Sequence, residues 1–242
     1  MSPYLIRRSI TPDDPQQRYL DMQQRTSGLI DYLRTGQPAD CVETDRPGQL
    51  PFAPVSHYLW SAHTYRPRAA ACCAWYDKGL TVLLAAGESN PKVSHTQHQD
   101  AVYEDSCLEF FVCPDPARSQ VYLNFELNAR GALLLEHGRD RVHRQPFDSR
   151  LRDTVLIKTA RQSQPNPFWS VYLDIPTDLL LHPLKAKGLE ASSVWAPGHQ
   201  MTVNFYKCGD KTDYPHYGCW HLINSQQPDF HRPADFGSAK LV

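Results

Sequence analysis

The chain has 242 residues, and its 25 basic and 26 acidic side chains give a formal net charge of -1. Without any run of like charges, this balance argues against a dedicated surface for nucleic acid or for an anionic membrane. The start of the chain lacks the apolar run of a secretory signal, and no stretch has the length of a transmembrane helix. The seven cysteines are not compactly spaced. We therefore expect reduced thiols in a cytoplasmic protein.

The first 36 residues predict a short strand followed by one helix. A hydroxyl N-cap at Thr11 and a proline at the next position mark the start of the helix, which continues to about Leu33. Gly36 is a plausible end, because glycine tolerates the left-handed conformation that closes helices. We expect residues 1–36 to form an extension that packs on one main domain of residues 37–242.

The main domain predicts an all-β fold. Aromatic and β-branched runs alternate with proline-rich loops, and no regular helices intervene. This succession is typical of a two-sheet antiparallel β-sandwich. The expected strands are 57–60, 69–76, 80–85, 107–112, 121–128, 132–135, 154–159, 168–175, 199–207 and 240–242. The aromatic loop 209–236 is longer than about fifteen residues, so we expect it to be functional.

Two of these strands carry a polar face. Residues of a strand point alternately to opposite faces of the sheet, and in 121–128 the apolar positions alternate with Tyr122, Asn124, Glu126 and Asn128. The strand at 107–112 adds Glu109. Carboxylates, amides and aromatic rings on one face are the groups that hold a polar, ring-shaped ligand such as a sugar. The alternative is that they form the solvated face of an antiparallel sheet.

The order of the motifs resembles that of the family 9 carbohydrate-binding modules. An aromatic residue, an acidic loop and a Glu-aromatic strand occur in Tyr103-Glu-Asp-Ser-Cys-Leu-Glu109-Phe-Phe111. The later motifs are Phe125-Glu-Leu-Asn128, Asn204-Phe-Tyr206, Trp220 and Phe230-His-Arg-Pro-Ala-Asp-Phe-Gly237. The matches cover roughly residues 57 to 242 in the expected order.

This resemblance implies non-catalytic binding of a small carbohydrate or of the end of a polysaccharide. Tyr103 and Phe230 would take the places of two tryptophans that enclose a terminal sugar, and Glu109 would grip its hydroxyl groups. Glu126 stands where the family can carry an arginine. The resemblance also implies structural calcium, which the sequence does not place. The expected ligand contacts are Tyr103, Glu109, Glu126, Asn128, Asn204 and Phe230.

Other interpretations of the same residues stay open. Glu109 and Glu126 could be the paired carboxylates of a glycoside hydrolase, or the domain could bind a protein partner through an exposed apolar patch. For Cys208, His216, Cys219, His221 and His231, the spacing does not fit the usual zinc pairs, so buried thiols and hydrogen-bonded imidazoles are expected. We expect core positions for Trp60, Trp75, Trp169, Trp195 and Trp220, and surface or sheet-edge positions for Asn124, Tyr172 and Tyr206.

Overall fold

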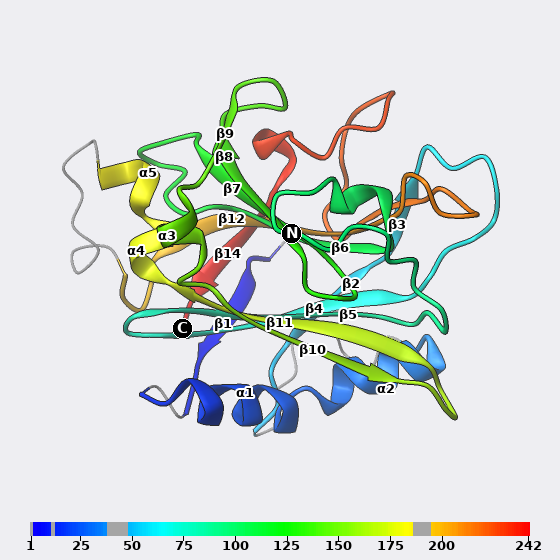
Figure 1. Cartoon of the computed structure of the whole chain (residues 1–242). Coiled ribbons are helices and arrows are strands. Elements are labelled where there is room, and N and C mark those ends of the chain that lie inside the picture. Colours follow the sequence, from blue (N-terminus) through cyan, green and yellow to red (C-terminus); the bar gives the residue numbers. More distant parts are fainter. Residues whose placement is uncertain (1, 11–12, 38–47, 186–194) are drawn as a thin grey trace.

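The computed structural model describes residues 2–10, 13–37, 48–185 and 195–242 (Figure 1). Its strands are β1 (Tyr4–Arg8), β2 (Phe52–Val55), β3 (His57–Leu59), β4 (Ala69–Tyr76), β5 (Gly79–Ala86), β6 (Cys107–Cys113), β7 (Tyr122–Asn128), β8 (Leu133–Gly138), β9 (Arg144–Pro146), β10 (Leu156–Gln162), β11 (Phe168–Pro176), β12 (Gln200–Cys208), β13 (Tyr217–Cys219) and β14 (Gly237–Leu241). The α-helices are α1 (Pro15–Gln24), α2 (Ser27–Thr35), α3 (Ser149–Arg152), α4 (Thr177–Leu180) and α5 (His182–Lys185). The prediction of a mostly β fold is confirmed.

The strands join one curled sheet. Within the described ranges, the main path is β10-β11-β5-β4-β1-β14-β12-β6-β7-β8-β9, and β2, β3 and β13 pair beside it. The curl brings β10, β11, β5 and β4 into one layer and β12, β6, β7 and β8 into a second (Figure 1). Their apolar faces meet in the main core, where Trp75 and Leu173 of the first layer belong to the same cluster as Phe110, Phe125 and Phe205 of the second. Burial of this apolar area is the main term that holds the layers together.

Strand β1 makes the sheet mixed, whereas the sequence predicted antiparallel pairing. It runs parallel to β14 on one side and to β4 on the other. Parallel neighbours require a long crossover connection, and α1 and α2 lie in the chain between β1 and β4. The alternation of a five-residue strand does not reveal its partner, so the sequence could not specify this arrangement.

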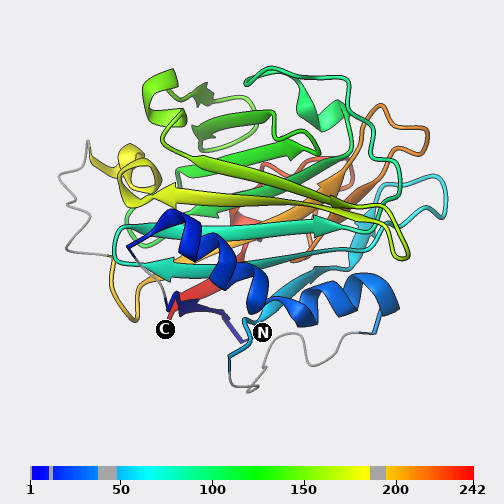
Figure 2. The same cartoon turned by 60° about the horizontal axis from the view of Figure 1, so that its bottom comes forward.

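Two helices replace the single predicted one, and they cover the outer face of the first layer (Figure 2). The predicted start at Thr11 lies outside the described residues; the observed N-cap is Asp14, whose carboxylate accepts from the backbone N–H of Gln16 at 2.8 Å. Gly36 ends α2 with a φ of 72°, as predicted. None of the helices in the described ranges is both long and apolar enough to cross a bilayer.

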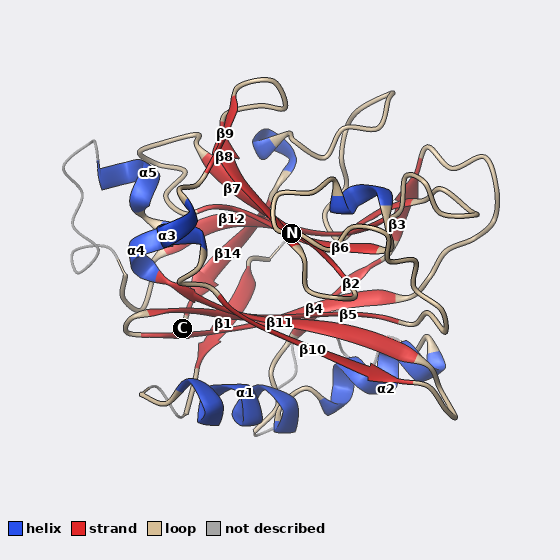
Figure 3. Ribbon diagram, in the orientation of Figure 1, coloured by secondary structure: helices blue, strands red, loops and turns tan. Residues whose placement is uncertain are grey.

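The polar faces of β6, β7, β11 and β12 are mostly buried, not exposed to solvent. Helices cover one layer, and loops surround the other (Figure 3). Tyr172, expected at the surface, is buried under Tyr19 of α1, with ring centroids 5.0 Å apart. Tyr206, also expected there, is buried under Phe230 of the loop 209–236, and Asn124 is fully buried as well. The sequence also missed short elements between its expected strands, among them β2, β9, α3, α5 and β13.

Candidate ligand-binding pocket

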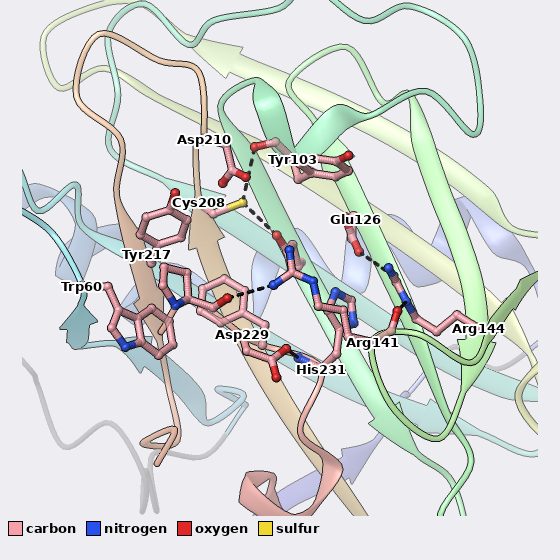
Figure 4. Close-up of a pocket in the computed structure, with 13 residues that line it drawn as sticks. Trp60, Tyr103, Glu126, Arg141, Arg144, Cys208, Asp210, Tyr217, Asp229 and His231 are labelled. Carbon is pink, nitrogen blue, oxygen red and sulfur yellow. Dashed lines mark hydrogen bonds and ion pairs between the residues drawn. The ribbon is translucent and has the colours of Figure 1, made fainter. Parts of the chain in front are cut away.

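A pocket of about 310 Å³ lies on the outer face of the second layer (Figure 4). Three neighbouring strands supply its floor, with Glu109 from β6, Glu126 from β7 and Cys208 from β12. Segments distant in the sequence form its walls. The lining residues are Trp60, Tyr103, Glu109, Glu126, Arg141, Arg144, Cys208, Asp210, Tyr217, Pro228, Asp229, Phe230 and His231.

The register of the strands brings the two floor carboxyl groups together. Glu109 is directly opposite Glu126 across β6 and β7, and Tyr206 of β12 is opposite Glu109 on the other side. Directly opposed residues have Cβ atoms roughly 4.5–5.5 Å apart. Each of the two glutamates is only 2% exposed. The predicted polar face therefore exists, but it forms the floor of a pocket.

Glu109 is a buried acid without a nearby base among its main electrostatic neighbours. Burial is the largest influence, and the charges of Cys208 and Glu126 add to it, so the pKa of Glu109 lies well above its usual range. The Cys208 thiol donates a hydrogen bond to Oε1 of Glu109 at 2.8 Å. The loss of a proton from the Glu109 carboxyl group is therefore disfavoured. In its protonated form this group can both donate and accept hydrogen bonds.

Glu126 has a partial counter-charge. Burial raises its pKa to about 7, although Arg144 acts in the opposite direction. The guanidinium of Arg144 lies 3.8 Å from Glu126 and 2.7 Å from Glu136, and Figure 4 shows it reaching toward Glu126 across the floor. Asn124 also donates to Glu126, at 3.0 Å. Glu126 thus changes its charge near neutral pH, and the pKa of Glu109 is shifted in the same direction.

Aromatic rings form much of the wall. Tyr103, in the 3-10 turn Val102–Glu104 before β6, is 38% exposed. Phe230 is 8% exposed, and it stacks on Tyr206 with ring centroids 4.0 Å apart and an interplanar angle of 13°. In Figure 4, Tyr103 lies on one side of the pocket and Trp60 and Tyr217 on the other. The structure therefore brings both predicted clamp residues to one pocket.

Trp60 was expected in the core, but it lines this pocket. Its ring packs against Phe230 and Tyr217 at centroid distances of 5.9 and 6.1 Å. Its indole N–H donates to the carbonyl of Ser225 at 2.8 Å, which fixes the ring against the loop 209–236. Trp75, Trp169 and Trp195 are buried, as predicted.

Asn128 and Asn204 share the polar face but are not among the lining residues. Asn128 donates to the carbonyl of His95 and to Asp105, and its oxygen accepts from two backbone N–H groups. Asn204 donates to the carbonyl of His221 and accepts from the backbone N–H groups of His221 and Phe205. Their amides are thus used to hold loops against the sheet.

The sequence did not identify the two arginines of the wall. Arg141 follows β8 in the turn to β9, and it donates to the carbonyl of Pro228 at 2.9 Å. This bond joins two walls that are 87 residues apart in the chain. No periodicity marks residues that meet only through loops. Residues 137–150 are rich in histidine and arginine, but composition alone does not point to a position.

The five residues considered for zinc form no group at metal-ligating distances within the described ranges, and the three histidines have other partners. His221 bonds the carbonyl of Asp235, His231 bonds the Tyr122 hydroxyl, and His216 bonds the Lys207 ammonium. A different group has metal-ligating geometry within the described residues: Cys107, Glu109 and Cys208. Its sulfur atoms do not suit calcium, which prefers oxygen ligands, so it is not a place for the expected structural calcium.

Comparisons with known proteins give a consistent result. The family model described as "Carbohydrate-binding family 9" matches residues 45–241. A crystal structure from Bacteroides uniformis ATCC 8492, described as that of a candidate carbohydrate-binding protein, is 26% identical, with a TM-score of 0.66 over 80% of this chain and 87% of that one.

Two solved structures of family 9 modules from Caldicellulosiruptor kristjanssonii share the fold. The complex with cellotriose is 13% identical, with a TM-score of 0.59 over 99% of this chain and 93% of that one. The complex with glucose is 15% identical, with a TM-score of 0.55 over 80% of this chain and 84% of that one. A search of curated proteins found no match to this chain.

Proposed function

The chain belongs to carbohydrate-binding family 9, and we propose that it binds a carbohydrate, without transforming it, in the pocket on β6, β7 and β12. One observation carries this assignment of the site. The same pocket combines aromatic walls with two carboxyl groups that lie side by side on neighbouring strands of a rigid sheet. The family model spans the strands that carry these groups.

The aromatic walls would hold the apolar face of a sugar ring. The C–H groups of that face stack on aromatic rings, whose faces are electron-rich. Tyr103 and Phe230 are the proposed clamp, and Trp60 and Tyr217 extend it. Because Phe230 is backed by Tyr206 at 4.0 Å, it needs little further ordering when a ligand binds.

The floor would recognise hydroxyl groups. Protonated Glu109 can donate to one sugar oxygen and accept from a hydroxyl, while Glu126 accepts. Hydrogen bonds to a charged partner are stronger than those between neutral groups. In this proposal Glu109 and Glu126 are binding groups, and no residue is assigned a catalytic role.

The family 9 structures with cellotriose and glucose suggest the ligands to test first. We propose a small oligosaccharide or a polysaccharide end as the partner. We also propose a reducing compartment, such as the cytoplasm. In support, the six described cysteines are all free and buried.

Calorimetric titration with glucose, short oligosaccharides and their end-reduced forms tests the function. We expect saturable heat with one sugar class. Tyr103→Ala should weaken that binding by about 1–3 kcal/mol, the contribution of one stacked ring. Tyr214→Ala is the matched control, because this tyrosine is 56% exposed and does not line the pocket. Equal affinity of folded Tyr103→Ala and the parent protein would refute the clamp.

The hydrolase alternative predicts a different readout. A hydrolase would release the chromophore from chromogenic glycosides and would lose this activity in Glu109→Gln. The binding proposal predicts no turnover by the parent protein, together with weaker sugar binding by Glu109→Gln. Turnover that depends on Glu109 would replace the binding proposal.

A further inference from the structure

We propose that Cys107, Glu109 and Cys208 form a zinc-binding site in the floor of the pocket. The two sulfur atoms and a carboxylate oxygen all lie within 4.8 Å of one another, and all three residues are buried. In a tetrahedral zinc site with Zn–S bonds of about 2.3 Å, neighbouring donor atoms lie a little under 4 Å apart. The three donors therefore need only small shifts to share one ion.

The sheet itself positions these ligands. Cys107 of β6 is directly opposite Cys208 of β12. Glu109 is two residues further along β6, so its side chain points to the same face as that of Cys107. The carboxylate of Glu109 already lies 2.8 Å from the Cys208 sulfur. Two hydrogen-bonded strands thus hold all three donors without the ordering of a loop.

The donor chemistry selects the metal. Thiolate sulfur suits zinc, whereas calcium and magnesium prefer oxygen ligands alone. Zinc sites with three protein ligands keep a fourth position for water or another small ligand. Because Glu109 and Cys208 both line the pocket, the fourth position would face its interior. Water can reach it there.

The electrostatics of the floor favour a cation. Burial raises the pKa of Glu109 well above its usual range and that of Cys107 to about 12. The hydrogen bond with Cys107, followed by burial, raises the pKa of Cys208 well above its usual range. Nearby carboxylates act in the same direction: Glu126 raises the pKa of Glu109 and of Cys107, and Asp210 raises that of Glu109 and of Cys208, whereas Lys207 lowers that of Cys107. A divalent ion would replace their protons and remove this repulsion. One proton per ligand is released, so binding should tighten as the pH rises.

This site goes beyond the proposed sugar function, although both use Glu109. Zinc binding is therefore measured with the metal alone and without sugar. Failure to bind zinc would leave the sugar titrations unaffected, and failure to bind sugar would leave the metal titrations unaffected.

The test is a titration of the full chain, reduced and stripped with a chelator, with zinc in competition with a chromophoric chelator. We expect one tightly bound zinc per chain, with release of protons. Cobalt(II) as a spectroscopic probe should show thiolate-to-metal charge transfer and the visible bands of tetrahedral coordination. Binding of less than one equivalent of zinc, or a cobalt spectrum without thiolate bands, would overturn the proposal.

Variants locate the ion. Cys208→Ser should weaken zinc binding by more than roughly 100-fold, because even residues outside the ligand set change affinity by about 10–100-fold. Glu109→Gln keeps the size of the side chain, so it is the variant to use if Cys208→Ser does not fold. It should also weaken zinc binding. Cys113→Ser is the control. Cys113 is also a buried cysteine of β6, but its thiol donates a hydrogen bond to the carbonyl of Ser119. Unchanged affinity in both Cys208→Ser and Glu109→Gln would also overturn the assignment.

Discussion

Two buried carboxyl groups determine how the pocket responds to pH. Glu126 has a pKa of about 7, and that of Glu109 is well above its usual range. Both groups keep protons at pH values at which an unfolded chain would lose them. Charging either one in the folded protein therefore costs stability.

Glu126→Gln tests this effect. Near pH 4 both states of the parent protein bind the proton, so the substitution should change the free energy of unfolding little. As the pH rises from about 4.5 to about 7, the unfolded chain loses its proton first and the stability of the parent falls. Above pH 7 the variant should be more stable by up to about 3 kcal/mol, since one pKa unit corresponds to about 1.4 kcal/mol.

Denaturant unfolding of parent and variant at pH 4 and pH 8 gives the comparison. Asp178→Asn is the control, because Asp178 makes only an exposed ion pair with Lys185 and should change stability by less than about 1 kcal/mol. A gain of the same size at both pH values would show that the effect does not come from ionisation.

At the scale of residues, the sequence identified the side chains that share one face of a strand. Period-two alternation identified Glu109 and Glu126, and the family motifs identified Tyr103 and Phe230; all four line the pocket. Trp60 and Arg141 escaped detection because only the folded loops bring them near the pocket, and Arg144 because its three-residue strand β9 is too short to show alternation. Alternation also could not show that the side-chain amides of Asn128 and Asn204 form hydrogen bonds with backbone carbonyl groups.

At the scale of elements, one buried ion pair holds α1 to the sheet. The guanidinium of Arg18 donates to Asp174 on β11 at 2.6 and 3.0 Å, and it lies 4.0 Å from the centre of the Tyr76 ring. Tyr76 donates to the other carboxylate oxygen of Asp174 at 2.7 Å. Arg18 and Asp174 are 6% and 4% exposed, so neither can turn to solvent if its partner is lost.

Arg18→Met should therefore destabilise the protein by about 3–5 kcal/mol, because it leaves the Asp174 carboxylate buried without its cation. The measurement is equilibrium unfolding in denaturant. The double variant Arg18→Met with Asp174→Asn should recover part of this loss, since the uncompensated charge is gone. A loss below about 1 kcal/mol in the single variant would show that solvent reaches Asp174.

Helix boundaries were predictable only where a cap fixes them. Gly36 was recognised as a helix end because glycine readily adopts the left-handed conformation, and in the structure Gly36 has this conformation at the end of α2. The break between α1 and α2 at Arg25 and Thr26 has no proline or glycine to mark it. The three-residue strands β9 and β13 are too short for an alternation pattern.

At the scale of the whole molecule, the sequence predicted that residues 1–36 are an extension packed on residues 37–242, and the place of β1 gives this segment a larger role. This strand lies between β4 and β14, inside the sheet. The sequence predicted the sandwich because many strands alternate. It could not predict the parallel strand, whose pairing depends on residues at both ends of the chain.

A chain that begins at residue 37 should lose cooperative unfolding, because β4 and β14 would have no strand between them. Thermal unfolding followed by near-ultraviolet circular dichroism measures this. A chain that lacks only residues 1–3, which precede β1, should keep the parent transition. Native-like cooperative unfolding of the chain 37–242 would show that β1 is dispensable.

The pairing of β1 with β14 also constrains when the protein can fold. Tyr4 is aligned with Ala239, so β1 is synthesised long before the strand with which it pairs. Until β14 has emerged from the ribosome, β1 has a free edge on that side, and exposed strand edges can pair with other chains. The sheet is therefore completed late in synthesis, and the growing chain exposes a strand edge that the folded protein covers.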